Sequence, residues 1–449
     1  MMKCIEPFRD EGGALGFAIV MEDDTVIVRS HEEWRHERTG NKEFLRQLDD
    51  IAANVYWETK DNPLPGRPSG ECYEDPTLLQ DWQRNLARTV YHLDDRYYQT
   101  QVSWEIATWF KEELPFAPRL PFYAPTVSGK STALNHVILT SHRGFDYTNP
   151  TVAALQRELG QYHPTACIDS WHKIHGDRKM ELEQTYEKGF QQGGTVARVG
   201  QDDKVHRYPI YGWIAIATIH QPRAEDIQNR SVGIPMAERP PNVKLERLFD
   251  LAEIKTLKTR ALDLRLAALS GRIDIQAALA TGAGIAESYE PALSSRAIDI
   301  AHVLLVPGIL MKNDDPDAIL SHVLESQEQA KQYLDNSDQS DVFYAFQGVV
   351  ADATTNGLDG KTIDFRKITT NAASAQLIED LQQAGNLEDK KRPTTRWVFS
   401  QLSDLGFKMK TGEGAGHTTI FDESNFWQTY NRLVVKFGKR GEGRVAEGE

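Results

Sequence analysis

The spacing of apolar and polar residues changes several times along this chain of 449 residues. Near the N-terminus, two apolar stretches in the segment 16–30 (GFAIVMEDDTVIVRS) flank the acidic residues 22–24 and predict a β-hairpin. The charged segment 32–60 is typical of helix. A loop rich in proline and glycine, 61–72, follows and indicates a boundary between two parts of the chain.

The longest regular pattern is an alternation of short apolar strands with helical stretches, which runs from about 116 to 241. It predicts an α/β core in which helices cover both faces of a parallel sheet. Helical periodicity dominates after the double proline at 240–241, up to the polar segment 336–340. We therefore predict four parts: an N-terminal α+β segment (1–75), the α/β core with preceding helices (76–241), a helical lid (242–334) and a C-terminal module (335–449).

The segment 119–134 (RLPFYAPTVSGKSTAL) combines a short apolar strand, a turn-forming loop and a predicted helix. This is the layout of a P-loop, in which backbone N–H groups at a helix N-terminus bind nucleotide phosphates. In this interpretation Lys130 neutralises the phosphates and the Ser131 hydroxyl binds Mg²⁺. Ala124 replaces the usual first glycine. The residues expected to contact nucleotide are Ala124, Pro125, Thr126, Val127, Ser128, Gly129, Lys130, Ser131 and Thr132.

A P-loop ATPase also needs an acidic residue at a second strand end to support Mg²⁺. A small apolar strand ends at Asp169, 39 residues after Lys130, which leaves room for one intervening βα unit. Many hydrolysing relatives follow this aspartate with glutamate, whereas this chain has Ser170, and serine is no base near neutral pH without a partner. Three acidic residues of the next segment are either a displaced carboxylate or solvated surface charges: Asp177, Glu181 and Glu183.

The block 208–241 has two predicted strands that flank a loop. Thr218 and His220 end the first of them, where an ATPase commonly places a sensor of the γ-phosphate. Arg230, just before the second strand, is a candidate for contacting a phosphate bound by the same or an adjacent subunit, since arginine stabilises charge on a transferring phosphoryl group. The alternative for Arg230 is a structural ion pair.

The order of these motifs resembles that of a group of P-loop ATPases, mostly of unassigned function, encoded by archaeal chromosomes, plasmids, viruses and integrative elements. They are often described as helicase- or primase-associated. The resemblance covers roughly 100–310 and rests on five stretches in the same order: WEIATWF, TNPTVAALQRELGQYHPTACID, MELEQTYEKGFQQGGTVARV, YPIYGWIAIATIHQPRAEDIQNRSVGIPMAER and SSRAIDIAHVLLVPG. It implies an ATP-binding core, a helical lid and an oligomer that acts in replication or on mobile elements. Ala124, Ser170 and Asn229 depart from the family pattern.

The C-terminal segment 394–438 predicts a helix, a glycine-rich turn, a strand and another helix. Trp397, Leu402 and Leu405 share an apolar side of the first helix, and Gly406 is placed to cap it. The hairpin that follows resembles the wing of a winged helix, a module that contacts DNA phosphates with basic residues. The alternative is a small protein-binding module of the same fold. The candidate DNA contacts are Lys390, Lys391, Arg392, Arg396, Lys408 and Lys410.

Composition places limits on these interpretations. The net charge of −14 argues against nucleic acid wrapped over the whole surface, but the segment 390–449 carries 11 basic and 7 acidic residues. We therefore expect DNA to contact the C-terminal module. Three cysteines are too few for a disulfide framework, and no apolar run is long enough to span a bilayer, so we expect a cytoplasmic location without membrane contact.

The sequence thus favours a protein that binds ATP and Mg²⁺, hydrolyses ATP, acts on DNA in a helicase-like way and forms a homo-oligomer. Two alternatives remain open. Ser170 motivates a nucleotide-binding switch or scaffold that has lost hydrolysis. The basic C-terminal segment motivates a DNA-binding regulator in which the P-loop fold is only structural.

Overall fold

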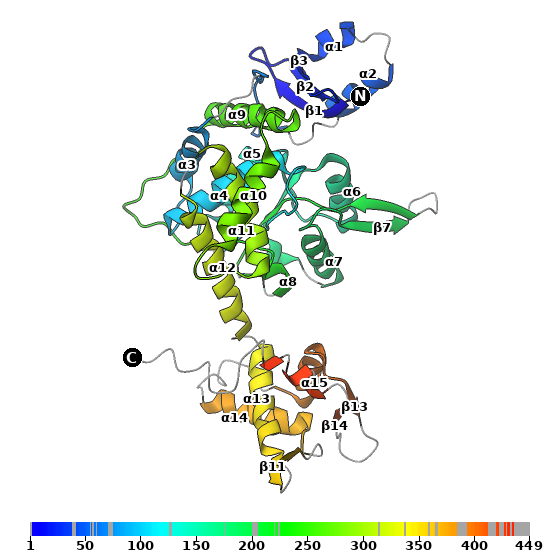
Figure 1. The fold of residues 1–449 in the computed structure, drawn as a ribbon, viewed down its shortest axis with the longest axis vertical. Coiled ribbons are helices and arrows are strands. Elements are labelled where there is room, and N and C mark those ends of the chain that lie inside the picture. The colour runs from blue at the N-terminus through cyan, green and yellow to red at the C-terminus, as the bar shows by residue number, and fades with distance from the viewer. Residues whose placement is uncertain are drawn as a thin grey trace. The chain divides into compact units, whose positions relative to one another are not determined.

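The computed structural model describes residues 2–37, 42–53, 55, 58–59, 61–70, 75–124, 128–174, 176–199, 205–219, 221–222, 225–312, 315–335, 338–357, 360–363, 367–383, 393–411, 419–421, 426–427, 429–431 and 433–434. The chain forms two compact units, Met1–Glu328 and Gln329–Glu449. Figure 1 shows the elements of both, and each unit is considered by itself.

The centre of the first unit is a five-stranded sheet with the order β10-β4-β9-β6-β5. All four strand pairs are parallel, which confirms the predicted α/β core. Its strands are β4 (Leu120–Tyr123), β5 (Gly144–Asp146), β6 (Thr165–Ile168), β9 (Ile214–Thr218) and β10 (Ile234–Pro235). Strands β6 and β9 are buried along their whole length, as expected for parallel strands that are covered on both faces.

Small and large side chains alternate along the central strands and give the two faces of the sheet different partners. Ala215 and Ala217 of β9 belong to a core shared with helix α5 (Lys130–Thr140). Ile214 and Ile216 pack instead with helices α6 (Val152–Tyr162) and α7 (Gly176–Lys188). Since strand side chains alternate with a period of two, this pattern fixes which side chains of the other strands face α5.

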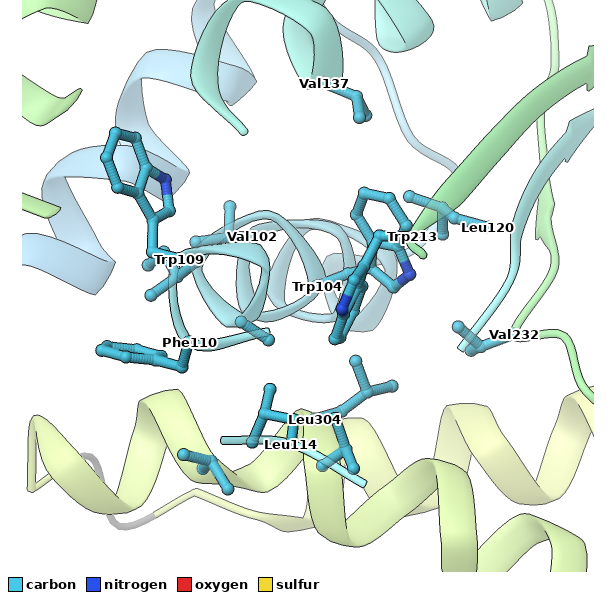
Figure 2. Packing of buried hydrophobic residues seen from close by; sticks show 14 of the residues in the cluster. Val102, Trp104, Trp109, Phe110, Leu114, Leu120, Val137, Trp213, Val232 and Leu304 are labelled. Atoms are coloured by element: carbon cyan, nitrogen blue, oxygen red, sulfur yellow. The ribbon is translucent and has the colours of Figure 1, made fainter. Parts of the chain in front are cut away.

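Helices precede and follow the sheet, as the sequence predicts. They are α3 (Leu78–Thr89), α4 (Asp95–Ala107), α9 (Leu251–Leu269), α10 (Ile275–Glu287), α11 (Ser295–Leu310) and α12 (Asp317–Asp335). Figure 2 shows the rings of Trp104 on α4 and of Trp213, whose centroids are 5.1 Å apart, together with Leu304 on α11. Leu304 of α11 belongs to the same buried cluster, so the helices after the sheet share the core of the sheet domain.

A three-stranded antiparallel sheet begins the chain. Its strands are β1 (Met2–Arg9), β2 (Leu15–Met21) and β3 (Val26–Ser30), and the helices α1 (His31–Glu37) and α2 (Lys42–Ala53) follow. Pairing of β2 with β3 confirms the predicted hairpin around 22–24. The pairing of β1 with β2 was not predicted, because β1 contains a proline and several charged residues.

A buried cluster of charges connects this N-terminal sheet to the rest of the first unit. The carboxylate of Glu6 on β1 lies 2.9 Å from Nε of Arg265 on α9 and 3.0 Å from Nε2 of His142. The side chains of Glu6 and Arg265 are only 4% and 2% exposed. Arg265 also holds both carboxylate oxygens of Glu112. The positive charges of Arg143 and Arg265 hold the pKa of Glu6 well below its usual range despite its burial.

A two-stranded antiparallel hairpin, β7 (Thr195–Val199) with β8 (Val205–Pro209), interrupts the path from α7 to β9. Figure 1 shows it extending beyond α6 and α7 rather than joining the central sheet. The side chain of Val205 is 63% exposed, in keeping with that position. The short helix α8 (Glu225–Gln228) lies between β9 and β10.

The described residues of the second unit form helices and two-stranded antiparallel hairpins. They are α13 (Asp338–Asp352), β11 (Thr354–Gly357), β12 (Gly360–Ile363), α14 (Thr370–Gln383), α15 (Thr395–Asp404), β13 (Met409–Thr411) and β14 (Thr419–Phe421). The order of α14, α15 and the β13–β14 hairpin is that of a winged helix. Leu402 and Leu405 are buried as predicted, in a core with Phe346 and Phe407.

Gly406 ends helix α15 in the way the sequence predicts. Its φ of 96° is left-handed, its N–H donates to the carbonyl of Ser403, and the next N–H, of Phe407, donates to Leu402. These two hydrogen bonds form a Schellman cap. The cap turns the chain directly into the β13–β14 hairpin.

Substituting Arg265 with methionine tests the buried cluster. Arg265→Met leaves Glu6 and Glu112 without their shared guanidinium, and we expect the free energy of unfolding to fall by about 3–5 kcal/mol. The control is Arg46→Met, because Arg46 pairs with Asp50 at 3.9 Å with side chains 79% and 68% exposed, and we expect a loss below about 1 kcal/mol. Urea unfolding of the full chain, followed by tryptophan fluorescence, measures both. Equal effects of the two variants would contradict the assignment of the cluster as an anchor.

Candidate functional site

Three strands of the central sheet end side by side at its carboxyl edge, where open α/β sheets bind their ligands. Tyr123, the last residue of β4, pairs with Thr218, the last residue of β9. Strand β6 ends at Ile168, which pairs with Ile216 of β9. The residues that follow β4 and β6 therefore emerge at one edge, on either side of β9.

Helix α5 begins at this edge, directly after β4 and its loop. Gly129 occupies the N-cap position with φ 81° and ψ 5°, a left-handed conformation that disfavours residues with a Cβ. Gly129 has no side chain to cap the first turn of α5, and no other side chain among the described residues is recorded as its cap. Such a helix start presents backbone N–H groups to an anion. The predicted loop residues Pro125, Thr126 and Val127 lie outside the described residues.

Lys130 is the first residue of α5, and its ammonium group turns back over the loop. Its Nζ donates to the carbonyl of Ala124 at 2.8 Å and to the hydroxyl of Ser128 at 3.1 Å. Partial burial lowers the pKa of Lys130, and the negative charge of Asp169 opposes that effect. The ammonium group of Lys130 is therefore held by Ala124 and Ser128, and it is close enough to Asp169 at the end of β6 for their charges to interact.

Ala124, which stands where a P-loop usually has glycine, lies in the core at the end of β4. Its side chain is 4% exposed and packs in the main core, while its N–H donates to the carbonyl of Thr218 at 3.3 Å. The extra methyl group thus points into the protein. Thr218 itself is 4% exposed, and its pairing with Tyr123 puts it beside the strand that leads into the loop.

Ser131 and Asp169 come together as the sequence predicts for a metal site. The hydroxyl of Ser131 donates to Oδ2 of Asp169 at 2.9 Å. A hydroxyl and a carboxylate are oxygen ligands of the type that Mg²⁺ prefers, so these residues fit the expected ion. The second carboxylate oxygen, Oδ1, accepts the N–H of Ser170 at 2.5 Å, which orients Asp169.

Ser170 occupies a left-handed turn with φ 56° and ψ 37°. The chain leaves the sheet there and enters a short 3-10 turn, Trp171–Lys173, whose first ring is buried. The position directly after Asp169 thus supplies no carboxylate.

The other two positions predicted to contact phosphate are His220 and Arg230. His220 lies outside the described residues. Arg230, whose side chain is 15% exposed, forms ion pairs of 3.3 Å with Glu187 and with Asp226 of its own chain. The role of Arg230 toward a neighbouring subunit stays a prediction.

The acidic residues of α7 belong to the opposite side of the sheet from α5. Leu182 and Tyr186 anchor α7 in the cluster that includes Ile214 and Ile216. Glu183 on this helix has a raised pKa because it is partly buried. A different carboxylate, Asp146 at the end of β5, does lie at the carboxyl edge and was not singled out from the sequence.

The predicted DNA contacts are only partly described. Arg396 in the first turn of α15 and Lys408 after it are exposed. Lys410 pairs with Ile420 across the β13–β14 hairpin. Lys390, Lys391 and Arg392 lie outside the described residues.

The similarities of this chain to known proteins are to solved structures. No protein family and no curated protein matches the sequence. The apo structure of the NrS-1 C-terminal region is similar with 12% identity and a TM-score of 0.33, covering 93% of this chain and 95% of that one. The Drosophila ORC bound to DNA has 10% identity and a TM-score of 0.20, covering 86% of this chain and 99% of that one. Cdc6p from Pyrobaculum aerophilum has 9% identity and a TM-score of 0.20, covering 77% and 95%.

Because these TM-scores are below 0.5, the fold assignment rests on the sheet itself. Parallel strands, a glycine-capped helix after the first core strand and an acidic residue after the third define a P-loop-like α/β fold. Within the described part of the chain, no helix combines the length and the apolar character needed to cross a membrane.

The Ser131–Asp169 pair predicts how nucleotide binding depends on Mg²⁺. In Asp169→Asn and in Ser131→Ala, we expect the Mg²⁺ concentration for half-maximal binding of a fluorescent ATP analogue to rise at least about tenfold, since an oxygen ligand is weakened or lost. Ser170→Ala is the matched control, because it removes a neighbouring hydroxyl that has no proposed contact with the ion. An unchanged Mg²⁺ dependence in both site variants would contradict the metal assignment.

Proposed function

We propose that this protein binds MgATP at the carboxyl edge of its sheet, hydrolyses it, and uses the hydrolysis in work on DNA. One observation carries the proposal: Lys130, Ser131 and Asp169 meet at the glycine-capped start of α5, with 2.9 Å between the Ser131 hydroxyl and the Asp169 carboxylate. A nucleoside triphosphate with Mg²⁺ requires three parts: a positively charged side chain, backbone N–H groups at a helix start, and oxygen ligands for the ion.

The roles of the residues follow from this arrangement. Backbone N–H groups at Gly129 and beyond bind phosphate oxygens, and Lys130 exchanges its present carbonyl and hydroxyl partners for the phosphates. Mg²⁺, when bound, neutralises phosphate charge and is held by Ser131 with support from Asp169. Thr218, buried between the two strand ends, is placed to detect the γ-phosphate.

Two observations support DNA as the partner: the excess of basic residues near the C-terminus and the order of helices and strands in the second unit. The segment 390–449 is basic within an acidic protein, and Arg396 and Lys408 are exposed. The winged-helix order of α14, α15 and the β13–β14 hairpin offers a surface of a type that contacts phosphates. The resemblance to helicase- or primase-associated ATPases supports a homo-oligomer with a role in replication or on mobile elements.

A second candidate function is a nucleotide-dependent switch or scaffold without turnover. Ser170 favours it, because the turn after Asp169 carries no carboxylate to activate water. Both candidates share the same ATP site, so they differ only in the chemical step.

Hydrolysis of MgATP by the wild-type protein and by Lys130→Ala distinguishes the candidates. With single-stranded DNA present, we expect turnover by the wild type to increase, and we expect Lys130→Ala to lose at least about 100-fold in rate because a positive charge on the phosphates is removed. Tight ATP binding without turnover in the wild type supports the switch. Absence of ATP binding contradicts both candidates and leaves a regulator in which the fold is only structural.

The basic residues of the second unit predict the salt dependence of DNA binding. In the full chain, the double variant Arg396→Gln, Lys408→Gln should weaken binding and lower the slope of log affinity against log salt by up to about 2, since two phosphate contacts are lost. Fluorescence anisotropy with a labelled oligonucleotide measures this. Arg46→Gln, at an exposed arginine of α2, is the control and should leave the slope unchanged. Equal slopes for the double variant and the wild type would exclude these residues as phosphate contacts.

A further inference from the structure

We propose that Asp146, at the carboxyl end of strand β5, is the general base that activates the attacking water in place of the carboxylate missing at position 170. This inference rests on the proposed ATP site and names a further catalytic residue for it. It follows from three observations: the strand to which Asp146 belongs, the face of the sheet on which it lies, and its electrostatic relation to Asp169.

The strand that carries Asp146 is the neighbour of the strand that leads to Asp169. β5 and β6 are parallel, and Asp146 pairs with Cys167. Asp169 lies two residues beyond Cys167, just past the end of β6. With strands about 4.8 Å apart and a rise of about 3.3 Å per residue, the Cα atoms of the two aspartates are about 8 Å apart.

The alternation of side chains places Asp146 on the face of the sheet that α5 covers. Phe145 packs against the cluster on the α6 and α7 face, so its neighbour Asp146 has the opposite orientation. Cys167, its partner across the strands, is buried in the core that contains Ala133 and Leu134 of α5. Asp169 has the same parity as Cys167, and its contact with Ser131 at the start of α5 fits that orientation.

The pKa shifts of Asp146 and Cys167 agree with the placement of Asp146 near Asp169 and beside Cys167. The side chain of Asp146 is exposed at the surface, but partial desolvation of its carboxylate and, less strongly, the negative charge of Asp169 raise its pKa. Asp146 in turn contributes to raising the pKa of the buried Cys167 thiol, after burial itself. A carboxylate in partly desolvated surroundings accepts a proton more readily than one in bulk water. The hydroxyl of Thr148 donates to Oδ2 of Asp146 at 3.4 Å, and this hydrogen bond opposes the rise in the pKa.

The chemical step uses one water molecule and the bound nucleotide. The oxygen of water forms a bond to the γ-phosphorus, and the bond between that phosphorus and the β–γ bridging oxygen breaks. The electron pair of the broken bond stays with ADP. One proton of the water passes to the Asp146 carboxylate, which later releases it to solvent, so the products are ADP, inorganic phosphate and a proton.

The other acidic candidates are less well placed. Position 170 is a serine in a left-handed turn. Asp177, Glu181 and Glu183 belong to α7, which packs on the opposite face of the sheet through Leu182 and Tyr186. Among the residues that the structure describes, Asp146 combines a strand end at the carboxyl edge with the α5 face, as Asp169 does, and unlike Asp169 it has no part in the proposed metal site.

The test compares binding and chemistry in variants of the full chain. Asp146→Asn keeps the shape of the side chain and removes its basicity. We expect its affinity for MgATP, measured with a fluorescent analogue at equilibrium, to stay within about threefold of wild type. We expect its single-turnover hydrolysis to slow by about 100-fold or more, which is the usual contribution of a general base. Asp146→Glu should recover part of the rate.

Matched variants separate this result from a general effect of losing an acidic side chain. Asp95→Asn makes the same change at an exposed position of α4 and should leave both binding and rate unchanged. Glu181→Gln tests whether α7 supplies the carboxylate. A loss of rate in Glu181→Gln with a normal rate in Asp146→Asn would overturn the proposal.

Failure of the inference is distinguishable from failure of the proposed function. If Asp146→Asn hydrolyses ATP at the wild-type rate while Lys130→Ala does not, Asp146 is not the base and the ATPase proposal stands. If Asp146→Asn loses ATP binding as well as hydrolysis, the assignment is overturned, because a base acts on the chemical step. If the wild type binds ATP without turnover, the inference and the hydrolysis fail together, and the nucleotide switch remains.

Discussion

The position of the candidate site depends on a carboxyl group that is buried among three helices. Glu105 on α4 is fully buried, and both of its oxygens accept hydrogen bonds within the protein. Nε1 of Trp82 on α3 donates to one oxygen at 2.7 Å, while the other contacts Nε2 of Gln101 at 2.8 Å and Nδ1 of His136 at 3.0 Å. His136 belongs to α5, the helix that begins at Lys130.

This network constrains three helices at once, because a buried polar group loses its water and must keep every internal partner. A shift of α5 along its axis would separate His136 from Glu105 and leave polar atoms unsatisfied in the core. Apolar contacts alone tolerate such sliding better, since they have no fixed geometry. The distance between the Ser131 hydroxyl and Asp169 is thus set partly by the contacts of His136 with Glu105 on α4 and Asn85 on α3.

Much of the core was predictable from the sequence because the signals of its strands are local. The strands LPFY, TACI and IAIAT are short apolar runs, and the spacing from Lys130 to Asp169 follows from one intervening βα unit. Strand β1 was missed because Glu6 and Pro7 interrupt its apolar pattern. Glu6 is buried only because Arg265, 259 residues later, comes to meet it, and no local pattern reveals such a pair.

Asp146 was missed for a related reason. Its strand has three residues, too few to show a period, and the meaning of the aspartate depends on which strand lies beside it. That neighbour is β6 rather than β4, which precedes β5 in the sequence, since the sheet order is not the order along the chain. The local pattern of the sequence pointed to the start of α5 and the end of β6, but it had no means of finding a third strand end next to the second.

The ion pairs of Arg230 within its own chain set a condition on its predicted role between subunits. Its guanidinium lies 3.3 Å from the carboxylate of Glu187, and its backbone carbonyl accepts the N–H of Arg119 at the start of β4. The backbone is therefore fixed to the sheet, whereas the side chain is held by one half-buried carboxylate and by the exposed Asp226. In the predicted role between subunits, a phosphate of an adjacent subunit would have to replace Glu187 as the partner of this cation. Phosphate carries more charge than a carboxylate and offers bidentate contacts, so that role requires the exchange to depend on bound nucleotide.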